Sequence, residues 1–452
     1  MRKSILRPLM AILLAAPLLT GCLAGKFMCN YALKPTPHGV DDIERTRHKA
    51  DSLCPGVIAW YDNLHNAGVF KDTTIVGEGG FKIHAVYAPA KNPAKAEGTA
   101  VVVHGYTDNH LVFLYLVKMY RDQFNYNVMV PDLQYHGYSE GRAAGMGWLD
   151  RLDVERWATL ANDLWHNDFM VVHGVSMGAA TTMMMSGDEL PAYIRAFVED
   201  CGYSSVWDQF AHNLKDSFHL PPFPVLNSAS IVCKSRYGWG FKEASSVKQL
   251  AKCERPMLFI HGDADDFVPF SHLQKNYDAK VNGYKEMWVG TGAVHANSYA
   301  KHPEEYTEHV RAFLKKAKTL SSRYSGTAIL VFLLYLQSLS PGEMSEWLKE
   351  PASKTGVRQR TGGSNPSLTA LCKANKGAAR QCGVFVWWRA RQELALVRVC
   401  RQTKREAQPR ARICFALGDQ GTSEGAARRN PSLLYELSQK NVKFECIINN
   451  IG

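Results

Sequence analysis

The sequence lacks the residue spacings with which proteins commonly hold a metal ion. Its 16 histidines and 11 cysteines form neither an HExxH motif nor a pair of CxxC motifs. The sequence therefore gives no support for a metal site. We expect the protein to work without a metal or any other cofactor.

Most of the chain also lacks a net charge. The whole chain carries 53 Lys and Arg residues against 42 Asp and Glu residues, a formal net charge of +11. The segment after Leu320 holds 20 of the basic and 9 of the acidic residues, which leaves 33 of each in the first 320 residues. A polyanion partner requires a basic surface, so we expect no nucleic acid partner for the folded part.

The N-terminus has no apolar run that is long enough to cross a bilayer. The run from Leu9 to Leu19 is too short, and it stands between a basic start and small residues, as in a secretory signal. The tetrapeptide that ends at Cys22, LTGC, resembles a bacterial lipobox, in which the cysteine is acylated. We expect residues 1–21 to be a lipoprotein-type signal peptide and Cys22 to carry lipid. An ordinary cleaved signal is the alternative.

Lipidation at Cys22 predicts where the protein resides. Several acyl chains on one cysteine give a stable membrane anchor, whereas a single chain holds only marginally. We therefore expect a protein of the bacterial cell envelope, lipid-anchored on the periplasmic side or in the outer membrane.

Five cysteines follow in the body of the chain: Cys29, Cys54, Cys201, Cys233 and Cys253. An exported protein can oxidise some of them to disulfides, and their odd number leaves at least one unpaired.

The pattern of apolar runs predicts an α/β fold with a mostly parallel sheet. Residues 73–88 read as a strand pair with a turn at Gly77 to Gly80, and helical patterns follow at Trp148 to Trp165 and Gly178 to Met185. Strands that alternate with helices indicate a parallel sheet covered on both faces. The expected buried strands are Thr99 to Val103, Val128 to Pro131, Phe169 to His173, Ala196 to Val198, Met257 to Ile260 and Glu286 to Val289.

Domain boundaries follow from breaks in this alternation. Residues 22–59 are expected to be a linker or helix, and residues 60–320 the α/β domain, closed by a helix over Pro303 to Lys318. Aromatic residues around the LPPFP stretch mark residues 206–250 as an inserted, mostly helical cap over one end of the sheet. Such a cap is suited to shaping a substrate pocket, although its aromatic residues could equally form its own core.

Residues 321–452 differ in character from the rest of the chain. Gly342 to Ala370, GEMSEWLKEPASKTGVRQRTGGSNPSLTA, resembles a translated tRNA gene, and the basic stretch after it has no regular periodicity. We expect this segment to be a poorly ordered, non-native tail of the readthrough type. The alternative is a genuine basic or membrane-contacting extension.

A candidate nucleophile stands in VVHGVSMGAATTMMM, Val171 to Met185. The sequence Gly174-Val175-Ser176-Met177-Gly178 is a GxSxG motif after an expected strand and before an expected helix. The glycines permit a sharp turn on which the serine is exposed in a strained conformation. A serine hydroxyl is a weak nucleophile, so this prediction also requires a base and donors for an oxyanion.

The remaining catalytic groups follow later strands. Asp265 lies in HGDADDFVP after the Met257 to Ile260 strand, and His295 lies in GTGAVHANSY after the next strand. Their order, Ser, Asp, His, is that of α/β-hydrolases and not of chymotrypsin or subtilisin. His295 would take the proton of the serine, and an acid would hold its tautomer. Asp200, after an earlier strand, is the alternative acid.

Two main-chain N–H groups are the candidates for an oxyanion hole. One belongs to Met177, the residue after the serine, and the other to Tyr106 in the HGY stretch after the Thr99 to Val103 strand. We interpret His104 in that stretch as a structural loop histidine.

Taken together, these motifs resemble the α/β-hydrolase superfamily over roughly residues 60 to 318. VVVHGYTDN, PDLQYHGYSEG, GVSMGAA, HGDADDFVP and HANSY occur in the expected order. The resemblance is to exported serine hydrolases related to the esterase and S9 and S33 peptidase branches. It implies an α/β-hydrolase fold, and its HGxxDxxVP pattern aligns Asp265 with the triad acid. Gln134-Tyr135 and Val294 depart from the usual residues, but neither departure removes a catalytic group.

The sequence thus predicts a membrane-anchored serine hydrolase that forms an acyl-enzyme on Ser176, most simply a carboxylesterase. Its partners would be a small ester or amide substrate and the membrane. A peptidase of the aminopeptidase or dipeptidyl-peptidase type usually needs an acidic pair for the N-terminus of its substrate, and the cap acids Asp208, Asp216 and Glu243 are scattered. A non-catalytic envelope binding protein of the same fold is the third reading.

Overall fold

The computed structural model describes residues 23–35, 40–338, 384–390, 393–401 and 411–416. It divides into two units, Met1–Ser322 and Arg323–Gly452, which are described separately. The predicted signal peptide, residues 1–21, and the predicted acylation site, Cys22, lie outside the described residues.

The first unit is built on an eight-stranded sheet with the order β1-β2-β4-β3-β5-β6-β7-β8. The first two strands and β4 pair antiparallel, and all later neighbours pair parallel. Each predicted strand is present, with ends that differ by a few residues. The strands are β1 (Lys71–Val76), β2 (Lys82–Ala88), β3 (Thr99–Val103), β4 (Asn127–Pro131), β5 (Met170–Val175), β6 (Ile194–Asp200), β7 (Met257–Gly262) and β8 (Lys285–Gly290).

Helices cover both faces of this sheet, and for that reason the central strands read as unbroken apolar runs. Every residue of β3, β4 and β5 is buried. In β3, Val101 and Val103 belong to one core cluster, whereas Ala100 and Val102 belong to the other, on the opposite face. The alternation shows why β3 tolerates no polar position between Ala100 and Val103.

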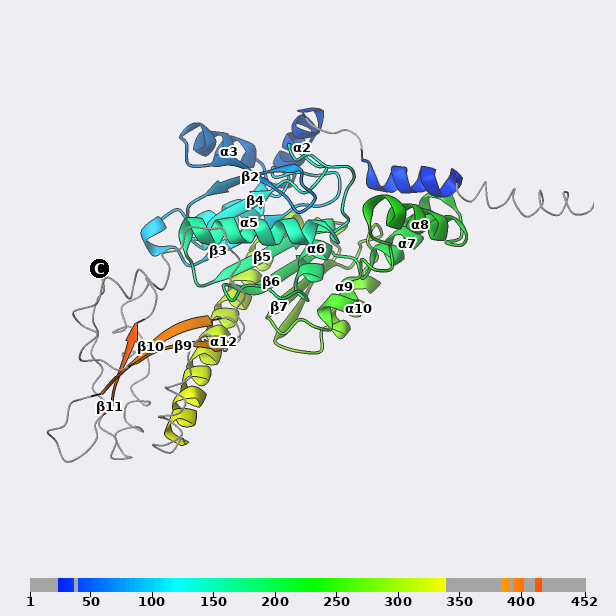
Figure 1. Ribbon diagram of the computed structural model, residues 1–452. Helices are drawn as coiled ribbons and strands as arrows, with labels where there is room; N and C mark the ends of the chain where they lie inside the picture. Colours follow the sequence, from blue (N-terminus) through cyan, green and yellow to red (C-terminus); the bar gives the residue numbers. More distant parts are fainter. Residues whose placement is uncertain (1–22, 36–39, 339–383, 391–392, 402–410, 417–452) are drawn as a thin grey trace, which may run out of the picture. The chain divides into compact units, whose positions relative to one another are not determined.

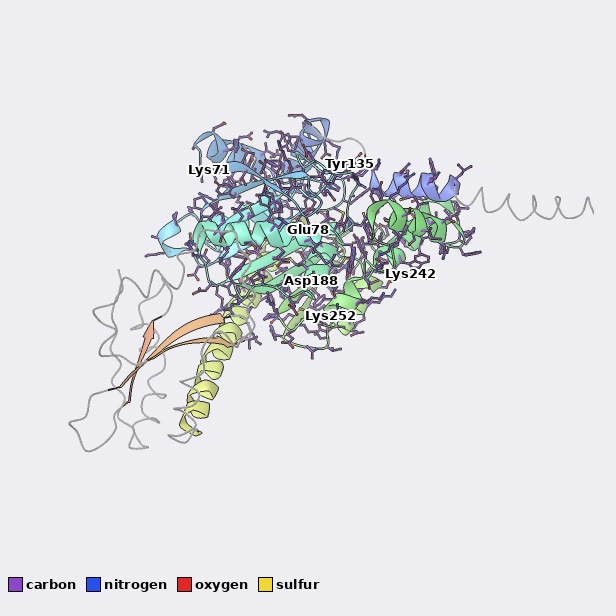
Figure 2. All side chains as sticks on the ribbon, viewed as in Figure 1. Lys71, Glu78, Tyr135, Asp188, Lys242 and Lys252 are labelled. Carbon is purple, nitrogen blue, oxygen red and sulfur yellow. The ribbon has the colours of Figure 1, made fainter. Side chains whose placement is uncertain are left out.

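The helices of the sheet layers follow the strands in the expected order (Figure 1). Figure 2 shows the side chains on this framework, and the labelled Glu78, Lys242 and Lys252 are exposed at the surface. The helices are α2 (Val40–Leu53), α3 (Val57–Asn66), α4 (Leu114–Lys118), the π-turn η2 (Met119–Gln123), α5 (Asp150–Trp165), α6 (Met177–Met185), α10 (Ser271–Ala279), α11 (Ser298–Lys301) and α12 (Pro303–Ser338); a short 3₁₀ turn η1 spans Pro93–Lys95.

The inserted cap is helical, as the sequence predicts. It comprises α7 (Val206–Phe218), α8 (Val225–Tyr237) and α9 (Ser246–Leu250), and a bridge between Ser205 and Ser245 closes its base. A helical segment over residues 23–33 packs against α8 (Figure 1). The sequence patterns did not predict this contact.

The second unit contains a three-stranded antiparallel sheet with the order β11-β10-β9. Its strands are β9 (Val384–Ala390), β10 (Glu393–Arg401) and β11 (Ala411–Ala416). The helix α12 also extends past the predicted end at Lys318 to Ser338. The prediction of a poorly ordered, non-native tail included neither feature, and it stays a prediction. Among the described residues, no helix combines the length and apolarity that a membrane span requires.

Candidate active site

Ser176 stands on a strained turn between β5 and α6. Its backbone has φ 58° and ψ −116°, a conformation that side chains with a Cβ rarely adopt. The two flanking glycines make the turn possible. A Cβ on Gly174 would lie 2.0 Å from the main-chain oxygen of Gly178, and one on Gly178 would lie 2.1 Å from that of Val103. The chain at this point thus accepts no larger residue at either position.

The structure brings the three predicted catalytic side chains together. The Ser176 Oγ atom lies 2.8 Å from His295 Nε2, and His295 Nδ1 lies 2.8 Å from Asp265 Oδ2. The side chain of Asp265 is fully buried, whereas that of His295 is 21% exposed. Because the carboxylate accepts from Nδ1–H, the Nε2 atom of His295 is free to accept the proton of the serine hydroxyl.

The carboxylate of Asp265 is held in its charged form by several donors. Its Oδ1 atom accepts the main-chain N–H groups of Phe267 at 3.1 Å and Val268 at 2.9 Å, and His261 Nε2 lies 3.2 Å from Oδ2. Burial alone would raise the pKa of Asp265, but the interactions with His261 and His295 outweigh burial and lower this pKa to about 2. Asp265 is therefore ionised at neutral pH. The sequence patterns did not assign His261 this contact.

Asp200, the alternative acid, has a different partner. It lies at the end of β6, and its Oδ2 atom accepts a hydrogen bond from the Tyr306 hydroxyl at 3.1 Å. Burial raises the pKa of Asp200 to about 6. The Tyr306 hydroxyl in turn lies 2.9 Å from His173 Nε2, so Asp200 of β6 is joined through Tyr306 of α12 to His173 of β5 in a buried polar chain. The geometry therefore favours Asp265 over Asp200 as the partner of His295.

The two predicted oxyanion-hole residues, Tyr106 and Met177, line the same cavity as Ser176. Met177 begins α6, where the first N–H groups of a helix have no partner within the helix. A Cβ on Gly105 would lie 3.3 Å from the Cβ of Ser176, so the loop after β3 passes directly beside the serine. Within the described part of the chain, neither the Tyr106 nor the Met177 N–H donates a hydrogen bond.

The loop that carries Tyr106 is braced from two sides. Arg45 of α2 donates to the main-chain oxygen of Thr107, and Lys49 of α2 lies 2.7 Å from Asp108. On the other side, His104 Nε2 accepts the Leu133 N–H at 2.9 Å, so its Nδ1 donates to the Gly105 oxygen at 2.7 Å. His104 thus has the bonding of a structural histidine. These contacts hold the loop in place before any substrate binds.

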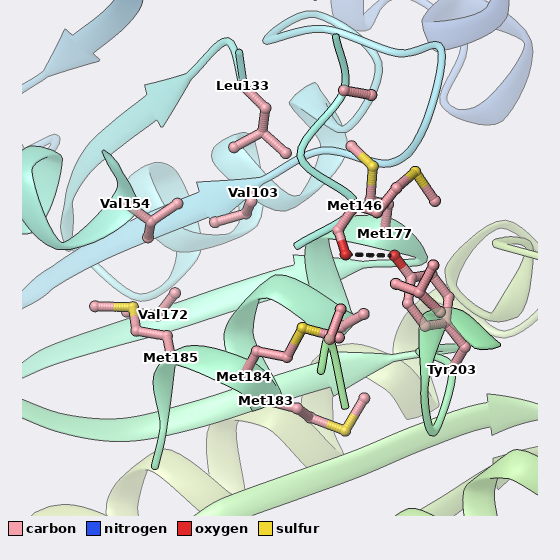
Figure 3. Packing of buried hydrophobic residues seen from close by; sticks show 14 of the residues in the cluster. Val103, Leu133, Met146, Val154, Val172, Met177, Met183, Met184, Met185 and Tyr203 are labelled. Carbon is pink, nitrogen blue, oxygen red and sulfur yellow. Dashed lines mark hydrogen bonds between the residues drawn. The ribbon is translucent and has the colours of Figure 1, made fainter. Parts of the chain in front are cut away.

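A cavity of about 420 Å³ opens above Ser176. Most of its lining side chains are apolar or aromatic. The majority of these come from the cap, the loop after β3 and the helical segment 23–33, and the loop after β7 adds Phe267 and Val268. Figure 3 shows the lining residues Met146, Met177 and Tyr203 close together, with the Tyr203 hydroxyl donating to the Met146 oxygen at 3.0 Å. Two carboxylates also line the cavity, those of Asp216 and Asp266. The site is suited to a substrate with an apolar group.

Hydrogen bonds join the cap directly to the loop that carries Asp265. Gln209 of α7 donates to the main-chain oxygen of Phe267 at 2.6 Å, and His212 Nε2 lies 2.9 Å from that of Asp266. The ring of Phe267 lies 4.9 Å from that of His295. These cap residues were missed by the sequence patterns, because a contact between α7 and a loop more than 50 residues away leaves no local signal.

Two groups among the described residues combine three potential metal ligands. One contains His84, His110 and Asp132, and the other contains Cys201 with the catalytic candidates Asp265 and His295. The Asp132 carboxylate already accepts the N–H groups of His110 at 2.7 Å and Tyr138 at 3.0 Å, as well as both imidazoles. Its oxygens are therefore engaged by the protein itself.

Comparisons with known proteins find one matching family model, similar sequences and similar solved structures. The model of the prolyl oligopeptidase family matches residues 134–320. The uncharacterized protein YqkD of Bacillus subtilis is 30% identical over 223 residues, which cover 49% of this chain and 72% of that protein. The uncharacterized protein YfhR of Escherichia coli K12 is 25% identical, with 53% of this chain and 76% of that protein covered. Among solved structures, the Pyrococcus furiosus esterase Pf2001 is 24% identical with a TM-score of 0.44, covering 55% of this chain and 91% of that one.

Proposed function

Because this chain belongs to the α/β-hydrolase superfamily of serine hydrolases, we propose that it is a carboxylesterase that forms an acyl-enzyme on Ser176. The observation that carries the proposal is the hydrogen-bonded series Ser176, His295 and Asp265 beneath an apolar cavity. The roles of the residues follow from this series.

Acylation begins when Ser176 Oγ attacks the carbonyl carbon of the ester and its proton passes to His295 Nε2. The negative charge on the carbonyl oxygen is stabilised by the N–H groups of Tyr106 and Met177. Asp265 stabilises the imidazolium that forms, and it keeps the ring in the required tautomer. The tetrahedral intermediate then expels the alkoxide, which takes the proton from His295 and leaves as the alcohol.

Deacylation repeats these steps with water. His295 removes a proton from the water, whose oxygen attacks the acyl carbonyl carbon. The bond to Ser176 Oγ breaks, and the serine recovers the proton from His295. The net reaction converts one ester and one water into a carboxylic acid and an alcohol.

The mostly apolar lining of the cavity supports an ester substrate. Two of the three cap acids do not line the cavity: Asp208 is hydrogen-bonded to Ser204, and Glu243 forms a surface ion pair with Lys234. Asp216 and Asp266 do line it, and this observation favours a second candidate function. An aminopeptidase or dipeptidyl-peptidase would use such carboxylates to hold the amino group of its substrate.

A comparison of substrates tests the two candidates. If the chain from Leu23 onward is an esterase, its kcat/KM for p-nitrophenyl butyrate should exceed that for aminoacyl p-nitroanilides. The Asp216→Asn variant should then hydrolyse the ester at the unmodified rate. A preference for the anilides, lost in Asp216→Asn, would establish the peptidase instead. Ser176→Ala must abolish either activity.

The membrane anchor is part of the proposal. Its support is the LTGC tetrapeptide after a signal-like N-terminus, which would place the enzyme in the bacterial cell envelope. Labelling of the expressed full chain with radioactive palmitate tests it, since incorporation should disappear in Cys22→Ser.

A further inference from the structure

The helical segment 23–33 forms part of the wall of the active-site cavity. Its residues Gly25, Cys29 and Leu33 are buried at intervals of four, so they share one face. This face packs on α8, where a Cβ on Gly25 would lie 2.7 Å from Ser228. From the same segment, Met28, Tyr31 and Ala32 line the cavity of Ser176. The chain directly after Cys22 is thus also part of the substrate pocket.

The other side of this segment exposes an apolar stripe. Leu23 is 63% exposed, Phe27 62% and Tyr31 60%, again at intervals of four, and the rings of Phe27 and Tyr31 stack with centroids 6.3 Å apart. The segment also carries Lys26 and contains no acidic residue. An amphipathic helix with aromatic residues and lysines is typical of segments that lie in a membrane interface.

A loop of the cap adds to this stripe. Leu220 and Phe223, between α7 and α8, are 41% and 73% exposed. The edge of Tyr31 meets Phe218, the last residue of α7, with ring centroids 5.4 Å apart. Segment 23–33 and α8 run in the same direction, because Gly25 faces Ser228 while Arg236 donates a hydrogen bond to Asn30 Oδ1 at 2.8 Å. The beginning of the segment therefore lies at the end of α8 that follows Phe223.

We propose that the face formed by Leu23, Phe27, Tyr31, Leu220 and Phe223, the apolar face, lies on the phospholipid membrane that holds Cys22. The cavity then receives the acyl chain of an ester that resides in that membrane. Leu23 and Tyr31 are eight residues apart, about 12 Å along a helix. Because Tyr31 belongs to this face and also lines the cavity, an acyl chain can pass from the leaflet into the cavity with little exposure to water. This inference rests on the proposed esterase function.

Vesicle binding tests the apolar face without the lipid anchor. The chain from Leu23 to Gly452 would be mixed with vesicles of phosphatidylcholine, which carries no net charge, so that the basic tail does not drive binding. We expect Phe27→Ser and Phe223→Ser each to reduce the affinity for the vesicles, measured by flotation, roughly tenfold. Val281→Ser is the matched control, because Val281 is also 73% exposed but lies in the turn before β8. It should bind as the unmodified chain does.

Activity supplies the second readout. Phe223→Ser should hydrolyse p-nitrophenyl butyrate in water at the unmodified rate, but p-nitrophenyl palmitate held in the vesicles roughly tenfold more slowly. Equal vesicle binding by the Phe27, Phe223 and Val281 variants would overturn the inference. So would a dimer in sedimentation that Phe27→Ser dissociates, since the face would then bind a second copy. If neither ester is hydrolysed, the proposed function fails, while the flotation result still decides whether the face binds membrane.

Discussion

The imidazole of His295 lies between Ser176 and Asp265, and its Nδ1 atom is 2.8 Å from a carboxylate with no exposed surface. Asp265 is itself fixed by the main-chain N–H groups of Phe267 and Val268. The orientation of His295 thus depends on a loop that the cap helix α7 also contacts. Catalytic geometry and the cap are linked through this loop.

Replacing the acid should reveal which aspartate serves His295. Asp265→Asn is expected to lower kcat by about 10⁴, because the amide would favour the wrong tautomer of the imidazole. Asp200→Asn should lower kcat far less, since Asp200 bonds to Tyr306. Steady-state kinetics with a soluble ester, beside urea unfolding to check folding, measures both. A larger loss in Asp200→Asn would exchange the two roles.

Asp265 should also make stability depend on pH. Its pKa falls from an ordinary 3.8 to about 2 on folding, so its stabilising effect is present above pH 3.8 and is lost as the pH falls through the folded value. The difference in unfolding free energy between the unmodified chain and Asp265→Asn should shrink by about 2 kcal/mol from about pH 5 to about pH 2. Urea titrations at several pH values measure it. Asp266→Asn, at an exposed neighbouring position, is the matched control variant.

Gly178 should be intolerant of any side chain. The Cβ of Gly178→Ala would meet the Val103 oxygen at 2.1 Å, which forces β3 and α6 apart at the serine. We expect a loss of about 1–3 kcal/mol of stability and a large loss of activity. Gly240→Ala is the control, because its nearest neighbour would lie at 3.4 Å. Equal unfolding curves for the two variants would contradict the described turn.

The wall formed by segment 23–33 should limit the length of the acyl group that the cavity accepts. Ala32 lines the cavity, so Ala32→Phe should reduce the rate for p-nitrophenyl octanoate while the rate for p-nitrophenyl acetate is retained. Lys26→Phe places the same ring on the exposed side of the segment and should change neither rate. An unchanged ratio of the two rates in Ala32→Phe would mean that the segment does not bound the acyl site.

Cys29 and Cys233 should form a disulfide when a disulfide oxidant such as oxidised glutathione is present. Both thiols are buried and unpaired, and their mutual influence lowers the pKa of Cys29 and raises that of Cys233. The thiolate of Cys29 would attack oxidised glutathione and release one reduced glutathione. Cys233 would then attack the Cys29 sulfur of the mixed disulfide and release the second reduced glutathione, which leaves the Cys29–Cys233 disulfide. Peptide mapping should find this link, joining segment 23–33 to α8. Recovery of both residues as free thiols would contradict the prediction.

The sequence predicts the sheet and the catalytic series because their signals are local. Ser176, Asp265 and His295 each follow a strand, and parallel strands end at the same edge of a sheet. The role of segment 23–33 depends instead on a contact with residues that are distant in the sequence. The spacing of Gly25, Cys29 and Leu33 indicates a helical face, but nothing near it indicates that its partner is α8, some 200 residues away.

The same reasoning explains the buried polar chain of His173, Tyr306 and Asp200, which links β5, α12 and β6. His173 reads as one residue of an apolar strand, and Tyr306 as one residue of a closing helix. Only the folded chain brings them within 2.9 Å of each other and places Asp200 beside Tyr306. Burial of such polar groups depends on long-range partners, which neither propensity nor periodicity encodes.

Labelling with a fluorophosphonate tests the central claim most directly. The chain from Leu23 to Gly452 would be treated beside Ser176→Ala, and intact mass followed by peptide mapping would locate the adduct. An activated serine predicts one adduct, on Ser176, and none in the variant. A folded chain that takes no adduct, or takes one that persists in Ser176→Ala, would contradict the account and favour a non-catalytic envelope binding protein of the same fold.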